Sequence, residues 1–323
     1  MKILAVGDSY ITPEAFARGL GPLEDRAAVR VIKLDEDETF APSSSSERRI
    51  REYAGNPRQL VAALSDGEVL VVHGAPVTDA VLDASPRLRL VCCARGGPVN
   101  VDAVAATERG IPIVTSPGKN ADAVADLTLT FILLLLRGIP AAQRFLVEGG
   151  QLGLSTFEGA RFFGHDLGGH RLGLVGYGNV GSRVATRALA FGMRVMVYDP
   201  YVAASSIERP GVVVGALDDL IASSDVVSLH ARATPENANL FGAPAFARMK
   251  AGSYFINTAR ESLVDEAALY DVVVAGHLAG AALDVLKAAP PARRRRCATS
   301  PTSSSRRTSG APPMRPRSGA WPW

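Results

Sequence analysis

The clearest chemistry in this sequence is carried by a glycine-rich turn and an acid that follows it. A Gly-x-Gly-x-x-Gly pattern begins at Gly176, directly after the apolar run 171–175, and Asp199 closes a second apolar run, 193–198. This order predicts a strand, a tight turn, a helix over 180–191 and a second strand that ends in a carboxylate, which together form a dinucleotide-binding unit. The alternative is a strand–helix–strand unit whose glycines serve packing alone, and the spacing to the acid favours the nucleotide.

Each part of this unit has a defined task in binding a dinucleotide. The first glycine permits the turn, the second lets a pyrophosphate approach the backbone, and the third lets the helix pack against the sheet. The free N–H groups at the start of the helix receive the phosphates. Asp199 would accept hydrogen bonds from the ribose hydroxyls and repel a 2′-phosphate, which favours NAD over NADP. The residues expected at the cofactor are therefore Gly176, Tyr177, Gly178, Asn179, Val180, Gly181 and Asp199.

A second chemical feature is Arg260, which follows the strand-like run 254–257. Ligands of open α/β sheets collect at the carboxyl ends of strands. A guanidinium there can bind a carboxylate and polarise an adjacent carbonyl, which suits a 2-oxo acid that accepts hydride. The alternative is a surface arginine that precedes the helix 265–274 and has no role in catalysis. We favour the catalytic role.

These residues require an α/β framework to position them. Short apolar or β-branched runs alternate with helix-like segments, so parallel sheets with helices on their faces are expected. We predict a smaller flavodoxin-like α/β lobe over 1–95, a doubly wound Rossmann domain over 96–287, and a basic tail over 288–323. The predicted strands are 3–6, 29–34, 69–73 and 88–93 in the first lobe, and 171–175, 193–198, 212–214, 226–230, 254–257 and 278–284 in the second.

Other segments are predicted from composition. The helix 120–137 is apolar on every side, so we expect it to be buried between domains or at a subunit contact. Its run 127–136 is too short to cross a bilayer. The stretch 41–46 is expected to be a polar surface loop, and 149–169 a glycine-rich loop.

The amino-acid composition and the distribution of charge argue against some classes of function. The chain has 323 residues and a formal net charge of +3, but nine of its 35 Lys and Arg lie after position 284, where there is no acid. Residues 1–284 therefore carry 26 basic against 32 acidic side chains, which gives little support for binding nucleic acid or membranes. Three cysteines form no disulfide framework, and Cys92–Cys93 suits a strand core. No signal peptide is visible, so a cytoplasmic location is expected.

With these motifs the chain resembles the D-isomer-specific 2-hydroxyacid dehydrogenases, in particular the branch near phosphoglycerate dehydrogenase. The resemblance covers about 60–285 well and the first 60 residues loosely. The motifs that carry it are the turn 95–102, the glycine pattern at 176–181 with Asp199, the segment 249–260, and the run 278–285.

The resemblance implies an NAD-dependent oxidoreductase that transfers hydride at C2 of a small 2-hydroxy or 2-oxo acid, in a homodimer without a metal. Arg260 would be the catalytic arginine. The substrate carboxylate would bind at the loop of Arg95, Gly96, Gly97 and Asn100. Further residues implied at the cofactor are His230, Thr234, Thr258, Ala259 and Asp284.

The carboxyl-terminal part departs from the family pattern. The family uses a histidine as acid/base, held by a glutamate. Ala289 stands where the glutamate is expected, and no histidine follows His277. His230 is offered as a substitute, but a structural or cofactor-lining role fits it better. The other histidines, His73, His165 and His170, show no metal-ligand spacing. An NAD-binding pseudoenzyme is therefore the alternative function.

One hypothesis explains both the missing pair and the unusual tail, namely a frameshift in the gene soon after codon 284. Back-translation of 305–313, read in triplets shifted by one base, yields Thr-Pro-His-Ile-Gly-Gly-Ala-Thr, which is the family's missing motif. The glutamate is not recovered by that shift. The runner-up is a genuine basic segment that binds RNA, DNA or an anionic membrane, in which case binding should weaken steeply with salt. Sequencing the gene through these codons separates the two.

Overall fold

The computed structural model describes residues 1–151, 158–207, 209–287 and 298–299. The chain divides into two units, Met1–Asn120 and Ala121–Trp323. Sequence reasoning placed the boundary after position 95, whereas the structure places it after Asn120. The reason is a strand at Ile113–Thr115 that pairs with the preceding strand of the first sheet and so keeps the intervening helix in the first unit. The predicted basic tail over 288–323 lies outside the described residues, apart from 298–299.

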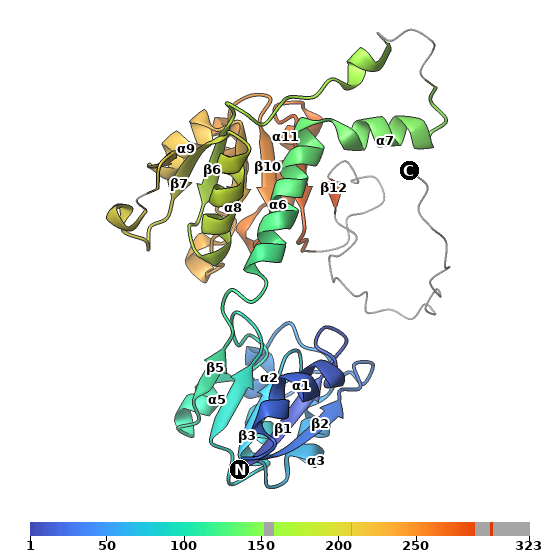
Figure 1. The fold of residues 1–323 in the computed structure, drawn as a ribbon, viewed down its shortest axis with the longest axis vertical. Helices are drawn as coiled ribbons and strands as arrows, with labels where there is room; N and C mark the ends of the chain where they lie inside the picture. Colours follow the sequence, from blue (N-terminus) through green and yellow to red (C-terminus); the bar gives the residue numbers. More distant parts are fainter. Residues whose placement is uncertain (152–157, 208, 288–297, 300–323) are drawn as a thin grey trace. The chain divides into compact units, whose positions relative to one another are not determined.

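The first unit is built on a parallel five-stranded sheet in the order β2-β1-β3-β4-β5 (Figure 1). This is the flavodoxin-like order, with the change of winding direction between β1 and β3. Its strands are β1 (Lys2–Gly7), β2 (Ala28–Lys33), β3 (Val69–Val72), β4 (Leu90–Cys93) and β5 (Ile113–Thr115). Its helices are α1 (Pro13–Leu20), α2 (Ser45–Arg49), α3 (Pro57–Leu64), α4 (Asp79–Asp83) and α5 (Ala103–Glu108), with a 3-10 turn at Gly21–Leu23.

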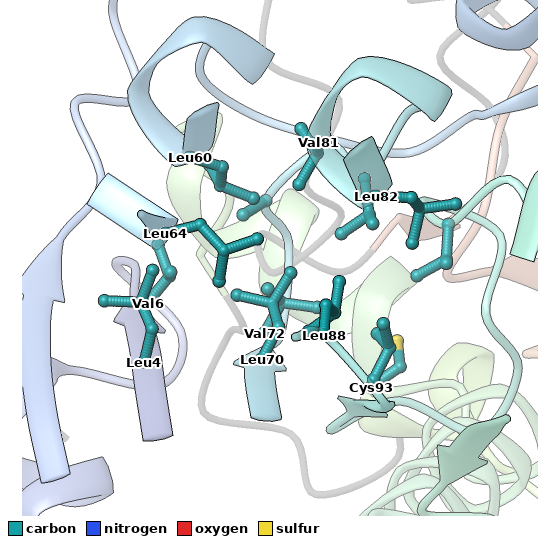
Figure 2. Packing of buried hydrophobic residues seen from close by; sticks show 14 of the residues in the cluster. Leu4, Val6, Leu60, Leu64, Leu70, Val72, Val81, Leu82, Leu88 and Cys93 are labelled. Atoms are coloured by element: carbon teal, nitrogen blue, oxygen red, sulfur yellow. The ribbon is translucent and has the colours of Figure 1, made fainter. Parts of the chain in front are cut away.

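Side chains along β1 point alternately to the two faces of the sheet, so the hydrophobic core of the first unit has two layers. Leu4 and Val6 belong to a cluster with the leucines of α3 and α4, and Figure 2 shows these side chains gathered between the helices and the sheet. Ile3 and Ala5 belong to a second cluster that includes Phe16 of α1. Both faces of the sheet are thus covered by helices, which accounts for the uninterrupted apolar run in this strand.

The second unit is a seven-stranded parallel sheet in the order β12-β11-β10-β9-β6-β7-β8. The order is that of a Rossmann domain, and its winding direction changes between β6 and β9. Its strands are β6 (Arg171–Val175), β7 (Arg194–Tyr198), β8 (Val212–Val214), β9 (Val226–Leu229), β10 (Tyr254–Asn257), β11 (Gly280–Leu283) and β12 (Ala298–Thr299). The predicted α/β class is confirmed in both units.

The helices of the second unit cover both faces of its sheet. They are α6 (Ala121–Leu136), α7 (Ile139–Val147), α8 (Asn179–Ala190), α9 (Leu217–Ser223), α10 (Ala243–Arg248) and α11 (Glu266–Val274). Short 3-10 turns lie at Glu158–Phe162, Ala204–Ser206, Pro235–Asn237 and Glu261–Leu263. One buried cluster joins α6 and α8 to the sheet, and another joins α9, α10 and α11 to it.

The structure corrects the expectation that α6 is apolar on every side, while its burial between domains or at a subunit contact stays a prediction. Its core positions pack on α8, β10 and β11, but Asp122, Asp126 and Thr130 are exposed. The two carboxylates bind Arg187 of α8, through its Nη2 at 3.0 Å and its Nε at 2.6 Å. The helix therefore has one polar face. Among the described residues no single helix is long and apolar enough to cross a membrane; α6 and α7 reach that length only together and bend by 67° between them.

A second correction concerns the stretch 41–46, expected to be a polar surface loop. Ser45 begins α2, and Ser46 is fully buried. The Ser46 hydroxyl donates to Asp102 and accepts from the backbone N–H of Asp79 at 2.9 Å. Asp102 also binds Arg49 through two hydrogen bonds, at 2.9 and 2.6 Å. Serine is buried here because this charged network satisfies its hydroxyl.

Candidate functional site

The glycine turn of the second unit lies at the carboxyl end of β6, where the winding direction of the sheet changes. Gly176 has a φ of 102°, and a Cβ there would lie 2.7 Å from the backbone of His230 and Ala231. A Cβ at Gly181 would collide with the carbonyl oxygen of Gly176. These two glycines therefore bring the turn and the start of α8 into contact with the end of β9, as the sequence predicted for the first and third positions.

The middle glycine has different surroundings. A Cβ added at Gly178 meets no protein atom within 4 Å, and the residue is exposed, as is Asn179. Gly178 caps the 12-residue helix α8 without a side-chain hydrogen bond. The first N–H groups of the helix, which include those of Asn179, Val180 and Gly181, have no acceptor within it. Open space in front of a helix N-terminus is the arrangement that binds a phosphate group.

Asp199 is fixed beside this turn. Its Oδ2 accepts a hydrogen bond from the backbone N–H of Tyr177 at 2.7 Å, and its Oδ1 accepts one from Tyr201 at 2.9 Å. The carbonyl of Tyr198 meanwhile accepts from the N–H of Gly176 at 2.8 Å. The acid predicted to hold the ribose is thus tied to the turn predicted to hold the phosphates.

His230 directly follows β9, on the other side of the change in winding direction. Its N–H donates to the carbonyl of Val175 at 2.8 Å, and its Nε2 lies 3.0 Å from the Ser228 hydroxyl. Burial lowers the pKa of His230 to about 3, so the imidazole is neutral near pH 7. A histidine that stays neutral is poorly suited to act as the acid/base near neutral pH, and the cofactor-lining role of His230 stays a prediction.

Thr234 lies in the loop that follows. Its N–H donates to Oδ1 of Asn237 at 2.8 Å, and the two residues form a capping box that begins the 3-10 turn Pro235–Asn237. The capping box fixes the loop at this edge of the sheet.

The next strand end carries Arg260. Asn257 is buried, and its side chain accepts from the N–H of Ala259 at 3.0 Å and donates to the carbonyl of Arg260 at 2.9 Å. The Thr258 hydroxyl lies 3.0 Å from that of Thr128 in α6. These contacts fix the backbone while leaving the Arg260 side chain exposed, and its Nη1 donates to the Ala259 carbonyl at 2.8 Å. The exposed guanidinium suits an anionic ligand better than a core role.

Asp284 follows β11 at the same edge of the sheet. Its N–H donates to the carbonyl of Asn257 at 3.0 Å, and burial raises the pKa of its carboxyl group. Its Oδ1 is buried, and no hydrogen-bond partner exists for it in the described part of the chain. Unsatisfied buried polar atoms are rare. An amide N–H, such as that of a nicotinamide carboxamide, would satisfy this oxygen, so the residues present fit the group that the sequence implied.

The predicted substrate loop belongs to the first unit. Arg95 binds Glu52 through its carbonyl and its Oε2, both at 2.5 Å. Cβ atoms at Gly96 and Gly97 would meet nothing within 4 Å. Asn100, in contrast, is fully buried; it donates to the carbonyl of Ala75 at 2.8 Å and accepts from the Cys93 thiol at 3.4 Å. Asn100 therefore holds the loop in place, while the two glycines leave its surface open.

Sequence reasoning gave His73 no role, yet the structure pairs it with Asp8. Nδ1 of His73 lies 2.8 Å from Oδ2 of a nearly buried Asp8. The two residues are 65 positions apart, so only the pairing of β1 with β3 brings them together. The signal that could have found them is that Asp8 comes shortly after one predicted strand and His73 ends another. In the described part of the chain, no cluster of three or more His, Cys, Asp or Glu could hold a metal ion.

Comparisons with known proteins agree with this geometry. Residues 129–303 match the family model described as D-isomer specific 2-hydroxyacid dehydrogenase, NAD binding domain. The chain is 40% identical over 233 residues to D-3-phosphoglycerate dehydrogenase of Mycobacterium bovis, which covers 72% of this chain and 43% of that protein. It is 36% identical over 259 residues to hydroxypyruvate reductase of Thermotoga maritima, which covers 80% of this chain and 82% of that protein.

A comparison with solved structures finds the same family likeness in three dimensions. The crystal structure of the TT0316 protein from Thermus thermophilus superposes with a TM-score of 0.73 at 30% identity, covering 93% of this chain and 89% of that one. The chain spans less than half the length of the phosphoglycerate dehydrogenases it matches. Similarity extends across both units and is supported by the motifs at the site.

Proposed function

Because the chain belongs to the D-isomer specific 2-hydroxyacid dehydrogenase family, we propose that it binds NAD in its second unit and oxidises a D-2-hydroxy acid, or reduces the matching 2-oxo acid. The observation that carries this proposal is the turn at the end of β6. Gly178 leaves open space before α8, and Asp199 is hydrogen-bonded to the same turn. Both features serve a dinucleotide, and packing alone requires neither.

The chain's own residues supply binding and orientation. The N-terminus of α8 binds the pyrophosphate, Asp199 binds the adenine ribose, and Oδ1 of Asp284 accepts from the carboxamide and fixes the orientation of the nicotinamide. Arg260 binds the substrate carboxylate and stabilises charge that develops on the carbonyl oxygen. The cofactor accepts or supplies the hydride.

A second function is favoured by a particular observation, the missing acid/base pair. The printed sequence has Ala289 where the family's glutamate is expected, and its last histidine is His277. His277 precedes β11, at the amino end of the sheet, and so lies away from the residues described above. General acid–base catalysis contributes about 10²–10⁴-fold to rates. The second candidate function is therefore an NAD-binding protein that turns over slowly or not at all.

One experiment tests both functions. NADH is titrated into the full chain by fluorescence, and turnover is measured beside it with hydroxypyruvate and other small 2-oxo acids. Arg260→Gln is the matched control, because it should retain NADH binding and lower any turnover. Binding with turnover supports the dehydrogenase, and binding without it supports the pseudoenzyme. Failure to bind NADH at millimolar concentration would refute both.

We also propose that the chain forms a homodimer through α7. None of the residues in this helix is buried, and three of its apolar side chains, Ile139, Leu146 and Val147, are 45%, 62% and 80% exposed. An exposed apolar surface of this kind is typical of a protein interface. Light scattering should give a dimer mass that Leu146→Glu with Val147→Glu halves. A monomer in the unaltered protein would contradict the proposal.

A further inference from the structure

A cavity of about 430 Å³ lies in the first unit, beside the first turns of α3 and α4. These two helices are neighbours, because Leu60 of α3 and Val81 of α4 belong to one buried cluster (Figure 2). The segment between β2 and α2 supplies another part of the wall. Pockets for small ligands have volumes of about 300–1,000 Å³, so the cavity is large enough to hold one. Within the described residues, its wall contains no residue of the substrate loop 95–100.

Asn56, at the start of α3, lines the cavity with an amide group that has spare donors. The residue is 8% exposed, and its Oδ1 accepts from the backbone N–H of Arg58 at 3.0 Å. This hydrogen bond identifies the other side-chain atom as the nitrogen. No acceptor for that Nδ2 group is found among the residues that the structure describes. Because buried polar groups are normally hydrogen-bonded, the amide points to a ligand that offers an oxygen.

Two further donors belong to the same wall. Arg58 is exposed, and no carboxylate of the described residues lies within 4 Å of its guanidinium. Thr78, which precedes α4, is 1% exposed, and its hydroxyl has no partner in the described part of the chain. Hydrogen bonds from a guanidinium are strongest to a charged acceptor. The unpaired donors therefore favour a ligand that carries an oxyanion.

The charge of the wall limits the charge of that ligand. Glu47 and Arg58 are the charged residues among the described ones that line the cavity. Oε2 of Glu47 accepts from the N–H groups of Ser43 and Ser44 at 2.6 and 2.9 Å. These hydrogen bonds, that of Ser44 first, lower the pKa of Glu47, so it is anionic at neutral pH. Since the two charges balance, a carboxylate with a single charge fits better than a phosphate dianion.

Apolar side chains form the rest of the wall and favour an apolar body on the ligand. Phe40 is stacked on Tyr53, with ring centroids 5.1 Å apart and 27° between the planes, so its ring is held in place. Val61 of α3 is 39% exposed and offers its side chain to a ligand. A pocket of apolar groups with a few polar ones is typical of sites for small organic molecules. The apolar residues of the wall are Phe40, Ala41, Pro57, Val61 and Ala80.

The segment 50–55 connects the cavity with the substrate loop. Glu47 and Asn56 stand on either side of this segment, and both line the cavity. Between them, Tyr53 carries the ring on which the cavity residue Phe40 is stacked. A ligand in the cavity would therefore touch both ends of the segment and the aromatic partner of its middle.

The middle of the same segment is bonded to the loop. The N–H of Arg51 donates to the carbonyl of Val99 at 2.7 Å, and Arg95 binds the carbonyl and the Oε2 of Glu52, both at 2.5 Å. Glu52 has a φ of 52°, a conformation that a residue with a side chain keeps only where its surroundings impose it. The segment is thus held between the cavity and the loop, so a change at one is passed to the other.

We propose that the cavity binds a small monocarboxylic acid with an apolar body, that its carboxylate accepts from Asn56 and Arg58, and that binding restrains the substrate loop through the segment 50–55. This regulatory site lies within the first unit and does not rest on the binding of NAD. A ligand that prefers one state of the loop shifts the loop toward that state, which is the physical basis of the control.

Calorimetric titration of the full chain tests the ligand class. Benzoate is the probe, benzamide has its shape without its charge, acetate has its charge without the apolar body, and phenyl phosphate replaces the head group. We expect benzoate to bind about tenfold more tightly than each of the other three, because only benzoate meets all the requirements of the wall. No binding of benzoate at about 10 mM, which is weaker than the pocket should give, would overturn the proposal, as would equal affinity for benzamide.

Variants assign the binding to this cavity. Arg58→Gln should weaken benzoate binding about tenfold, because it removes the charged donor. Val61→Phe should also weaken it by filling the space. Arg18→Gln is the matched control, because Arg18 is an exposed arginine of α1, a helix that packs on the other face of the sheet. Arg260→Gln excludes binding at the arginine of the second unit. Unchanged affinity in Arg58→Gln, with an unchanged melting temperature, would refute the site.

Hydrogen exchange followed by mass spectrometry tests the connection to the loop. Benzoate should slow exchange in peptides that cover 50–56 and 95–100 and leave peptides of α1 unchanged. Arg58→Gln at the same benzoate concentration should show little of this slowing. Benzoate binding that leaves exchange at 95–100 unaltered would refute the regulatory role.

Discussion

At the scale of single residues, the three glycines of the turn differ in what excludes a side chain. Gly176 is constrained by its φ and by the end of β9, and Gly181 by the carbonyl of Gly176. Gly178 is constrained by nothing in the described part of the protein. The sequence pattern assigned the turn to the first glycine and helix packing to the third, and the structure shows that protein contacts exclude a side chain at both positions.

This difference predicts opposite results for two alanine variants. Gly178→Ala should leave the melting temperature unchanged and weaken NADH binding at least tenfold, about 1.4 kcal/mol, because the methyl group occupies the space that the pyrophosphate needs. Gly181→Ala should cost about 1–3 kcal/mol of folding stability through overpacking. Thermal melts and fluorescence titrations measure both. Equal NADH affinity in Gly178→Ala and the unaltered protein would contradict the assigned site.

Asp199 leads to a prediction about cofactor choice. The unaltered protein should bind NADH much more tightly than NADPH, since a carboxylate repels the 2′-phosphate. Asp199→Ala removes this repulsion along with the ribose contact, so affinity for NADH should fall and the preference should shrink about tenfold or more. Titrations with both cofactors measure the ratio. An unchanged ratio would mean that Asp199 only anchors Tyr177 and Tyr201.

His230 predicts how the second unit responds to acid. Its pKa of about 3 in the folded protein lies below the value near 6.5 in the unfolded chain, so the unfolded chain binds more protons between these values. Stability should therefore fall by roughly 1.4 kcal/mol per pH unit as pH decreases below about 6.5. Urea unfolding at pH 7 and pH 5 measures the effect, and His230→Gln should remove it. The same pH dependence in both proteins would contradict this explanation.

At the scale of elements, the strands were largely predictable because each is a short apolar run between turn residues. The predicted runs at 212–214 and 254–257 match β8 and β10. β5 was missed although its three residues are all β-branched, like those of the correctly predicted β8, and its pairing with β4 is what shows that it belongs to the first sheet. α7 was missed because none of its residues is buried, so no apolar face is required by packing.

The contact between α6 and β10 can be tested through two hydroxyls. Thr128 and Thr258 are buried and lie 3.0 Å apart, and the Thr128 hydroxyl also donates to the carbonyl of Val124 at 2.8 Å. Thr128→Val should cost about 1–3 kcal/mol, because it leaves the Thr258 hydroxyl without this partner. The double variant with Thr258→Val should cost less than the sum of the single changes. Chemical unfolding of the four proteins gives the coupling, and strict additivity would show that the two hydroxyls do not interact.

At the scale of the whole molecule, the sequence predicted two α/β units but not the boundary between them. The residues predicted to bind the nucleotide lie close together in the sequence, at 176–181 and at Asp199, so a local pattern indicates them. The edge of the first sheet joins Asp8 and His73, which are 65 positions apart in the chain, so no local pattern could show their contact. Sequence reasoning likewise grouped Asn100 with the substrate loop, whereas burial makes it a support for that loop.

The two units should also lose stability in different ranges of pH. In the first unit, burial opposes ionisation of Asp8 and Asp102, but hydrogen bonds from His73 and Arg49 respectively lower their pKa values to about 2. A lowered carboxylate pKa stabilises the fold above the unfolded value near 4, and this stability is lost as pH falls toward 2, about 2 kcal/mol for each group. The second unit weakens earlier, below pH 6.5, through His230.

Hydrogen exchange followed by mass spectrometry can assign opening to each unit. Between pH 6.5 and 4, faster opening is expected in peptides from β6, β9 and α8, while peptides from β1 and β3 keep their protection. Asp102→Asn should lower the protection of the first unit at neutral pH and flatten its response between pH 4 and 2. Simultaneous opening of both units over one range would contradict separate titration.

The unfilled surroundings of Gly178 have a consequence for selection on the gene. If the codons for positions 176, 178 and 181 were randomised and the library sorted only for folded, protease-resistant protein, glycine should be recovered at the first and third positions, while many residue types should be recovered at the second. A further round of sorting on an immobilised nicotinamide dinucleotide should restore glycine at the second position. The two sorts would then show, within one motif, which glycines are required for folding and which for binding the ligand.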